Sequence, residues 1–330
     1  MIDKEMEYIC GGIQMKLLRK KDYEEIRLWV YRNARPIELA RWQYHFEAGS
    51  KENVLAALAV YQNPDGGFGN SLEPDNWNPY STSYTTHYAI RLLKEIDVID
   101  MNHPILQGIV RYLDSRVETN ENGWLFNVPS NNDYPHAPWW TYSPDDNLYE
   151  SVGVTAGLVE FILSYVDETS DLYEYALKLA DKLIQRLDAE NQLGEMEVTG
   201  YMNLSTGLKR FDLSHRYDIN KIDKKIKELV NTTIEHDVSK WVYHCKTPRD
   251  YIDSPNSQFY MENREITDCE LDYIIDTRIN NGVWNITWSW FENNETYGKE
   301  FAISENWWKS DLAITTLLHL RNFNRMEDFL

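Results

Sequence analysis

The sequence predicts an all-α protein, an (α/α)6 barrel in which two concentric layers of helices are joined by loops that carry short β-hairpins. The first observation is an alternation of helices with one apolar stripe and helices that are apolar nearly all round. A helix with one apolar stripe is typical of a surface, whereas a helix that is apolar all round is typical of a buried position. The second observation is a recurring turn with an aromatic residue between the two helices of a pair.

The clearest helix pair lies near the N-terminus. Residues 51–61, KENVLAALAVY, and residues 83–96, SYTTHYAIRLLKEI, each predict a helix, and the segment between them is rich in Gly, Pro and Asn. Residues 65–67, DGG, supply the positive φ angles that a tight turn needs. We expect the next residue, Phe68, to fold back and wedge between neighbouring helical hairpins.

The same pattern recurs along the chain at irregular spacing, with Trp124 and Trp284 in the place of Phe68. It is weakest between residues 190 and 265. The further amphipathic helices are expected at 103–117, 171–187, 221–237 and 269–279, and the apolar helices at 147–163 and 307–320.

The predicted elements suit one closed domain. Residues 22–47 supply two more helices, so the count reaches about twelve helices, or six hairpins. We therefore predict a single domain over residues 1–330, with the helices of residues 1–50 closing the ring. Short β-hairpin edges are expected in the loops at WVYH (241–244) and WNITWSWF (284–291).

Composition excludes several classes of partner. The net charge is −20, which argues against binding to nucleic acid and to an anionic membrane surface. The 12 Trp, 22 Tyr and 10 Phe suggest a ring-lined cavity or a large aromatic core. Three scattered cysteines, an acidic N-terminal segment and the lack of a long apolar run predict a cytoplasmic protein without an integral membrane segment. The oligomeric state stays open.

Residues 62–69, QNPDGGFG, resemble the glutamine–aromatic motif of the terpenoid cyclase and protein prenyltransferase superfamily, with Phe68 in place of tryptophan. The resemblance is strong over 51–96 and fair over 103–163 and 269–320. Members of this superfamily are α/α toroids. The resemblance therefore implies a toroid that holds an isoprenoid-type, apolar small molecule in a central aromatic cavity.

The catalytic motifs of that superfamily do not carry over. The Asp-x-Asp-Asp motif of one branch has no match, because residues 143–146 read SPDD and residues 73–75 read EPD. Zinc-binding relatives use an Asp, a Cys and a His, and Asp268, Cys269 and His319 offer these types without the expected spacing. Phosphate-cradling and dinucleotide-binding motifs are also missing. We expect no bound metal and no cofactor.

The candidate site is the rim where loops enter the inner helices, because helix N-termini there favour negative charge. Glu73 and Asp75 form a carboxyl pair in EPDN, and burial would let one of them act as a general acid or base. Further catalytic candidates are His87, Asp145 and Asp146. The candidates for substrate binding are Trp77, Tyr84, Trp139, Trp140, Tyr149, Glu150, Trp307, Trp308 and Asp311.

Each candidate also has a structural interpretation. EPDN is typical of a solvated Asx turn, and SPDD is a capping sequence with Ser143 as the N-cap and Asp146 reaching back. A lone histidine such as His87 in a buried helix is more often a core residue than a catalyst. The tryptophan doublets either line a pocket or plug the end of the barrel.

Three functions follow from these residues. In the first, a carboxylic acid protonates an isoprenoid-type substrate within an aromatic cavity. In the second, paired carboxylates and tryptophan platforms act on carbohydrate, as in α/α-barrel glycosidases or polysaccharide lyases. In the third, a toroid without catalytic activity binds a ligand or a protein. Whether the chain is an enzyme stays open at this level.

Overall fold

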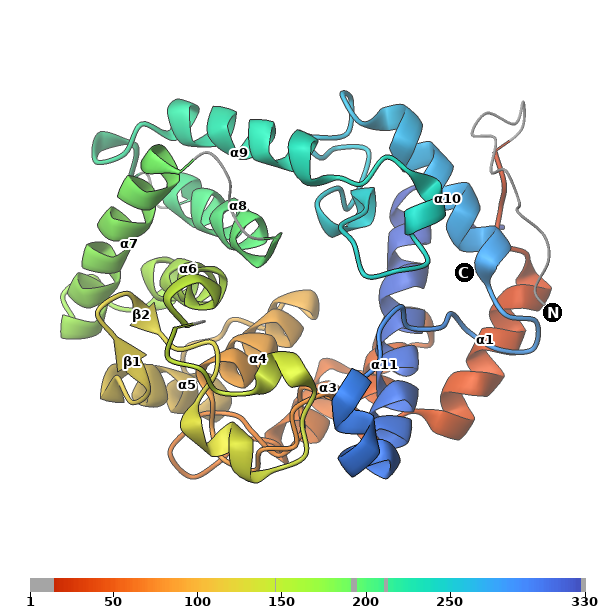
Figure 1. Ribbon diagram of the computed structural model, residues 1–330, viewed down its shortest axis with the longest axis horizontal. Helices are drawn as coiled ribbons and strands as arrows, with labels where there is room; N and C mark the ends of the chain where they lie inside the picture. The colour runs from red at the N-terminus through yellow and green to blue at the C-terminus, as the bar shows by residue number, and fades with distance from the viewer. Residues whose placement is uncertain (1–14, 146, 191–194, 211–212, 328–330) are drawn as a thin grey trace. The chain divides into compact units, whose positions relative to one another are not determined.

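The computed structural model describes residues 15–145, 147–190, 195–210 and 213–327 (Figure 1). Within these ranges it contains eleven α-helices, six short 3-10 helices and one two-stranded antiparallel sheet. The prediction of a mostly helical protein is confirmed, and the closed ring of two layers stays a prediction. None of the helices in the described ranges combines the length and the apolarity needed to cross a bilayer.

Most observed helices overlap the predicted ones, but α11 begins well before the predicted 307–320 and α8 falls where the sequence pattern is weakest. The elements are α1 (Lys20–Asn33), α2 (Pro36–Phe46), α3 (Lys51–Ala59), α4 (Ser83–Glu95), α5 (Pro104–Ser115), α6 (Asn147–Tyr165), α7 (Asp171–Ala189), α8 (Glu195–Arg210), α9 (Ile219–Thr233), α10 (Arg264–Thr277) and α11 (Asn294–Asn322), with strands β1 (Thr119–Asn120) and β2 (Gly123–Trp124).

The strand prediction placed the hairpin edges wrongly. Residues 241–244 form turns and residues 284–290 are irregular, while the observed hairpin pairs Thr119 with Trp124. The alternating aromatic residues of 284–291 anchor a loop and do not form a strand. For example, the indole Nε1–H of Trp284 donates to the Ile274 carbonyl at 2.7 Å, and its ring is buried. This side-chain hydrogen bond holds the segment in place without the backbone hydrogen bonds of a strand.

The chain divides into two compact units whose segments interleave in the sequence. Unit 1 comprises Met1–Glu47, Val230–Trp288 and Glu305–Leu330, and unit 2 comprises Ala48–Leu229 and Ser289–Ser304. Helices α9 and α11 each contribute to both units. The prediction of a single domain is not tested by this division, and each unit is described separately below.

Helix α6 is the core of unit 2 and packs against α4, α7 and α8 (Figure 1). Residues 151–164 of α6 are all buried, as predicted for a helix that is apolar all round. Small residues allow the close packing: a Cβ on Gly200 of α8 would lie 2.9 Å from the Cα of Gly153, and a Cβ on Gly157 would overlap the ring of His87 on α4. This close packing fixes α4, α6 and α8 against one another.

The Gln62–Gly69 motif is a structural staple. The Gln62 amide donates from Nε2 to the carbonyls of Gly66 and Ile105, both at 2.9 Å, and so joins the turn after α3 to the start of α5. Asp65 Oδ1 accepts the backbone N–H of Gly67 at 3.0 Å. These polar groups are engaged in bonds that shape the turn and join it to α5, so the motif positions the loop that follows it.

The aromatic residues after the turns make equivalent contacts in two successive helix pairs. Phe68 and Trp124 are fully buried. The backbone N–H of Phe68 donates to Thr86 Oγ1 of α4, and that of Trp124 donates to Thr155 Oγ1 of α6, each at 3.0 Å. The Trp124 ring also meets Tyr175 of α7 edge-on at 5.5 Å. The repeat inferred from the sequence therefore has a physical basis in a shared contact.

Buried arginines hold unit 1 together. Arg278 Nη2 donates to Asp22 Oδ1 at 2.6 Å and to Glu25 Oε2 at 2.9 Å, which ties the loop after α10 to α1. Arg325 Nη1 donates to Asp272 Oδ1 of α10 at 2.7 Å. Both guanidinium groups are almost completely shielded from solvent. These pairs join segments near the two ends of the chain to α10.

Candidate functional site

Two buried carboxyl groups stand at the centre of the candidate site in unit 2. Glu73 and Asp75 lie in the loop between α3 and α4, with 2% and 1% of their surfaces exposed. The Trp290 indole Nε1–H donates to Asp75 Oδ1 at 2.7 Å, and the Asp75 carbonyl accepts the backbone N–H of Ala137 at 2.9 Å. The loop is therefore fixed, and the interpretation of EPDN as a solvated turn does not agree with its burial.

Three aromatic rings pack together close to this pair. Tyr84, in the first turn of α4, meets Phe126 edge-on at 5.2 Å and Trp140 edge-on at 4.5 Å, while Phe126 and Trp140 stack at 4.7 Å. Burial, opposed by the positive charge of Arg91 and assisted by the charges of Glu73 and Asp75, raises the pKa of Tyr84 to about 12. Tyr84 is thus within electrostatic reach of both carboxyl groups and keeps its proton at neutral pH.

A network of asparagine side chains joins the acid-bearing loop to the loop that carries the rings. Asn131 Oδ1 accepts from Asn76 Nδ2 at 3.1 Å and from Asn78 Nδ2 at 3.0 Å. Asn131 Nδ2 in turn donates to the Trp140 carbonyl at 3.0 Å. All of these side chains are buried, so their mutual bonds hold the carboxyl pair and the aromatic rings in one fixed arrangement.

Two other tryptophans of the predicted rim, Trp77 and Trp139, form hydrogen bonds within the protein. The Trp77 indole Nε1–H lies 2.9 Å from Ser304 Oγ and 3.1 Å from the Pro74 carbonyl, so its polar edge is engaged. Trp139 is half-buried, and its carbonyl accepts from Asn127 Nδ2 at 2.8 Å. By contrast, the buried Nε1 of Trp140 has no hydrogen-bond partner among the described residues.

His87 belongs to the contact between α4 and α6. Burial lowers the pKa of its imidazole to about 3, with the positive charges of Arg91 and Lys94 acting in the same direction. The ring is therefore neutral at physiological pH and lacks the second proton that makes imidazolium an effective general acid. Its close approach to Gly157 favours the core interpretation, and a catalytic role stays a prediction.

The candidates at the start of α6 lie at the surface. Asp145, Tyr149 and Glu150 are exposed, and the Arg186 guanidinium lies 5.7 Å from the centre of the Tyr149 ring. Asp146 lies outside the described residues. Helix α6 begins at Asn147, whose backbone N–H donates to the Ser143 carbonyl at 3.3 Å, and the capping interpretation of SPDD stays a prediction. These exposed residues are not part of the buried arrangement around Glu73.

The remaining candidates, Trp307 and Trp308 of α11, belong to unit 1. The Arg35 guanidinium lies 4.7 Å from the centre of the Trp307 ring, a distance typical of a cation–π contact. Trp308 meets Trp288 edge-on at 5.5 Å. Both indoles are half-buried and in contact with protein groups, which leaves the pocket-lining and plugging interpretations equally open.

Asp311 has a partner that sequence reasoning missed. Its Oδ1 accepts from Arg41 Nη1 of α2 at 2.5 Å, and Arg41 is 1% exposed. At the N-cap of the same helix, buried Arg35 donates from Nη2 to Glu38 Oε1 at 2.5 Å. The spacing of Arg35, Glu38 and Arg41 on an otherwise apolar helix was the available signal, because charged residues at core positions are buried only as pairs.

A second group of buried titratable residues in unit 1 was also missed. The backbone N–H of Arg249 donates to Glu270 Oε2 at 2.8 Å, and its Nη1 donates to Thr316 Oγ1 at 3.1 Å. Burial raises the pKa of Glu270 to about 7, with Arg249 opposing this rise, and burial together with Arg249 lowers the pKa of His319 to about 3. Within the described ranges, no three side chains of the types that bind metals gather as a metal site requires.

Glu270→Gln is expected to flatten the pH dependence of stability. Between pH 4.5 and about 7 the folded state holds a proton on Glu270 that the unfolded chain releases, so the wild-type protein loses stability as pH rises through this range. The Glu270→Gln variant has no carboxyl group that titrates at this position, so it does not lose stability in this way. Urea unfolding at pH 5 and pH 8 should show the variant gaining roughly 2–3 kcal/mol relative to the wild type over that interval.

The matched control for this measurement is Glu265→Gln, an exposed carboxylate on the same helix. Its unfolding free energy should follow the wild-type pH profile. Parallel profiles for Glu270→Gln and the wild type would show that Glu270 is ionised in the folded protein at pH 5.

Comparisons of the chain with protein-family models, curated proteins and solved structures found no match. The resemblance to the α/α toroids therefore depends on the residues of the Gln62–Gly69 turn and the helix pairs that follow it, and membership of that superfamily stays a prediction.

Proposed function

We propose that this chain is an enzyme that protonates an isoprenoid-type, apolar substrate, with Glu73 as the proton donor and Asp75 as its charged partner. The observation that carries the proposal is the pair of carboxyl groups, two residues apart and 2% and 1% exposed, within electrostatic reach of Tyr84, whose ring packs against Trp140 and Phe126. Buried carboxyl groups in an apolar, aromatic setting are the arrangement that general acid catalysis uses.

The contacts support different roles for the two acids. The Trp290 indole N–H donates to Asp75, and a hydrogen bond to a carboxylate favours its charged form. A second carboxyl group near a fixed negative charge favours its protonated form, as in carboxyl pairs that divide acid and base roles. In this scheme Asp75 stays ionised and orients the site, while Glu73 carries the proton.

The chemical step follows from this division. The Glu73 hydroxyl transfers its proton to one carbon of an olefin, the two π electrons form the new C–H bond, and the neighbouring carbon becomes a cation. In this scheme the aromatic cluster of Tyr84, Phe126 and Trp140 supplies the ring density that stabilises such a cation. Loss of a proton from the cation to the Glu73 carboxylate completes the cycle and restores the acid.

Burial also bears on the carbohydrate alternative. A polysaccharide chain requires an open groove with two accessible carboxylates on either side of the scissile bond. The burial of Glu73 and Asp75 is more consistent with an enclosed, small substrate. An enclosed site further strengthens the electrostatic interactions on which the proton transfer depends.

Glu73→Gln is expected to lower turnover by about 100-fold, because the amide cannot supply the proton. The measurement incubates the protein with squalene and with farnesol and follows product formation by gas chromatography and mass spectrometry. The matched control is Asp114→Asn, the same carboxyl-to-amide change on the exposed face of α5, which should turn over at the wild-type rate.

Circular dichroism would check that each variant is folded. Equal turnover by Glu73→Gln and the wild type would overturn the role of Glu73. Failure of the wild-type protein to convert either olefin would count against the isoprenoid class and leave the carbohydrate and binding alternatives.

A further inference from the structure

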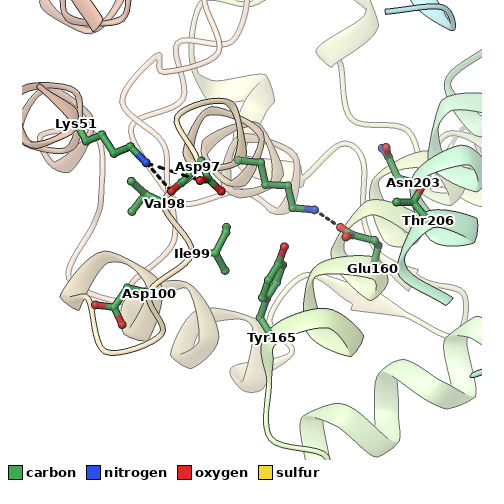
Figure 2. A pocket seen from close by; sticks show the side chains of 10 residues that line it. Lys51, Asp97, Val98, Ile99, Asp100, Glu160, Tyr165, Asn203 and Thr206 are labelled. Atoms are coloured by element: carbon green, nitrogen blue, oxygen red, sulfur yellow. Dashed lines mark hydrogen bonds and ion pairs between the residues drawn. The ribbon is translucent and has the colours of Figure 1, made fainter. Parts of the chain in front are cut away.

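A pocket separate from the candidate site lies in unit 2, around the C-terminal ends of α4 and α6 (Figure 2). Its volume is about 710 Å³, within the range of small-molecule sites. Glu73 and Asp75 precede the N-terminus of α4, so this pocket lies at the opposite end of that helix. Its walls come from the start of α3, the loop of residues 97–100, the ends of α4 and α6, and the middle of α8.

The two lysines that line this pocket are already engaged by protein groups. Lys94 forms an ion pair with Glu160, whose side chain is only 7% exposed. Lys51 Nζ donates to the Asp97 carbonyl at 2.9 Å. A charged ligand would have to compete with the Lys94–Glu160 pair, and separating a largely buried pair is costly. A neutral ligand can bind without separating it.

The pocket keeps hydrogen-bonding capacity that a neutral ligand can use. A lysine ammonium has three hydrogen-bond donors, and a carboxylate accepts about four hydrogen bonds. The Lys94–Glu160 pair therefore leaves several donor and acceptor positions for a ligand. The Asn203 amide has no hydrogen-bond partner among the described residues, and it is half-buried. Figure 2 shows Asn203 and Thr206 beside Glu160, with the apolar side chains of Val98 and Ile99 on the other side.

We propose that this pocket binds a neutral polyhydroxy compound the size of a monosaccharide or disaccharide. Hydroxyl groups both donate and accept, which matches a wall of paired charges and one amide. The C–H face of a sugar ring would lie against Ile99 and the Tyr165 ring, which is positioned 6.0 Å from the Lys94 ammonium. The proposal does not depend on the chemistry at Glu73.

The experiment is isothermal titration calorimetry of the full-length protein with glucose, mannitol and maltose, and with glycine and inorganic phosphate as charged probes. At least one of the three polyhydroxy compounds should bind. Asn203→Ala and Glu160→Gln should each weaken that binding about tenfold or more, because the first removes the free amide and the second replaces a charged hydrogen-bond acceptor with a neutral amide. Gln185→Ala, the loss of an exposed amide on α7, should bind like the wild type.

Asn203→Ala guards the test against misfolding, because Asn203 makes no side-chain hydrogen bond that the variant would lose. Glu73→Gln should also bind the sugar normally, so failure of this proposal can be told apart from failure of the proposed function. Binding of glycine or phosphate but none of the polyhydroxy compounds would overturn the ligand class. Unchanged sugar affinity in both pocket variants, or no binding of any probe, would overturn the site.

Discussion

Gly66→Ala should lower the free energy of unfolding by about 4 kcal/mol, combining backbone strain with a clash in a packed core. Gly66 has a φ of +96°, a conformation that residues with a Cβ rarely adopt. A Cβ built at this position would lie 2.1 Å from the carbonyl oxygen of Gly108 on α5. Because the obstacle is backbone, no change of side-chain rotamer can relieve the contact, and the turn must separate from α5.

The measurement is urea unfolding followed by circular dichroism, with Gly298→Ala as the matched control. A Cβ at Gly298 would have no neighbour within 4 Å, and the residue lies in α11. Alanine favours a helix over glycine by up to about 1 kcal/mol, so the control should be neutral or slightly stabilised. Equal unfolding free energies for Gly66→Ala and the wild type would mean that the turn does not pack on α5 as described.

The local part of this fold could be predicted from the sequence because its signals are local. A run such as residues 171–187 alternates apolar and charged residues with the period of a helix, and α7 spans Asp171–Ala189. The DGG turn could be identified because positive φ angles select for glycine, and Gly66 has such an angle. Prediction was weakest at α8, where Gly200 and Gly207 interrupt the helical signal and instead permit close contact with α6.

The candidate site was predictable to the extent that its residues lie close together in the sequence. Glu73, Asp75 and Tyr84 fall in one loop and the helix that follows it, so a single turn prediction placed them together. Trp290, which donates to Asp75, is 215 residues away. No local pattern connects these two positions, because the contact arises only when the chain has folded. The division into two interleaved units was hidden for the same reason.

Arg41→Met is expected to lower the free energy of unfolding by about 3–5 kcal/mol, the cost of removing one member of a buried ion pair. Arg41 is 1% exposed and the Asp311 side chain is 13% exposed. The variant leaves the Asp311 carboxylate in this shielded setting without its guanidinium. The double variant Arg41→Met with Asp311→Leu should recover much of the loss, since apolar side chains of similar size often replace a buried pair without cost.

Urea unfolding of the wild type, the two single variants and the double variant forms a double-mutant cycle that isolates the coupling between the two side chains. The comparison pair is Lys178 and Glu174 on α7, which lie 2.7 Å apart with both side chains 66% exposed. Lys178→Met should leave stability almost unchanged, because water solvates both charges when they separate. A loss from Arg41→Met no larger than that from Lys178→Met would mean that water reaches Asp311 in unit 1. Full additivity in the cycle would mean that the 2.5 Å contact contributes nothing to holding α2 against α11.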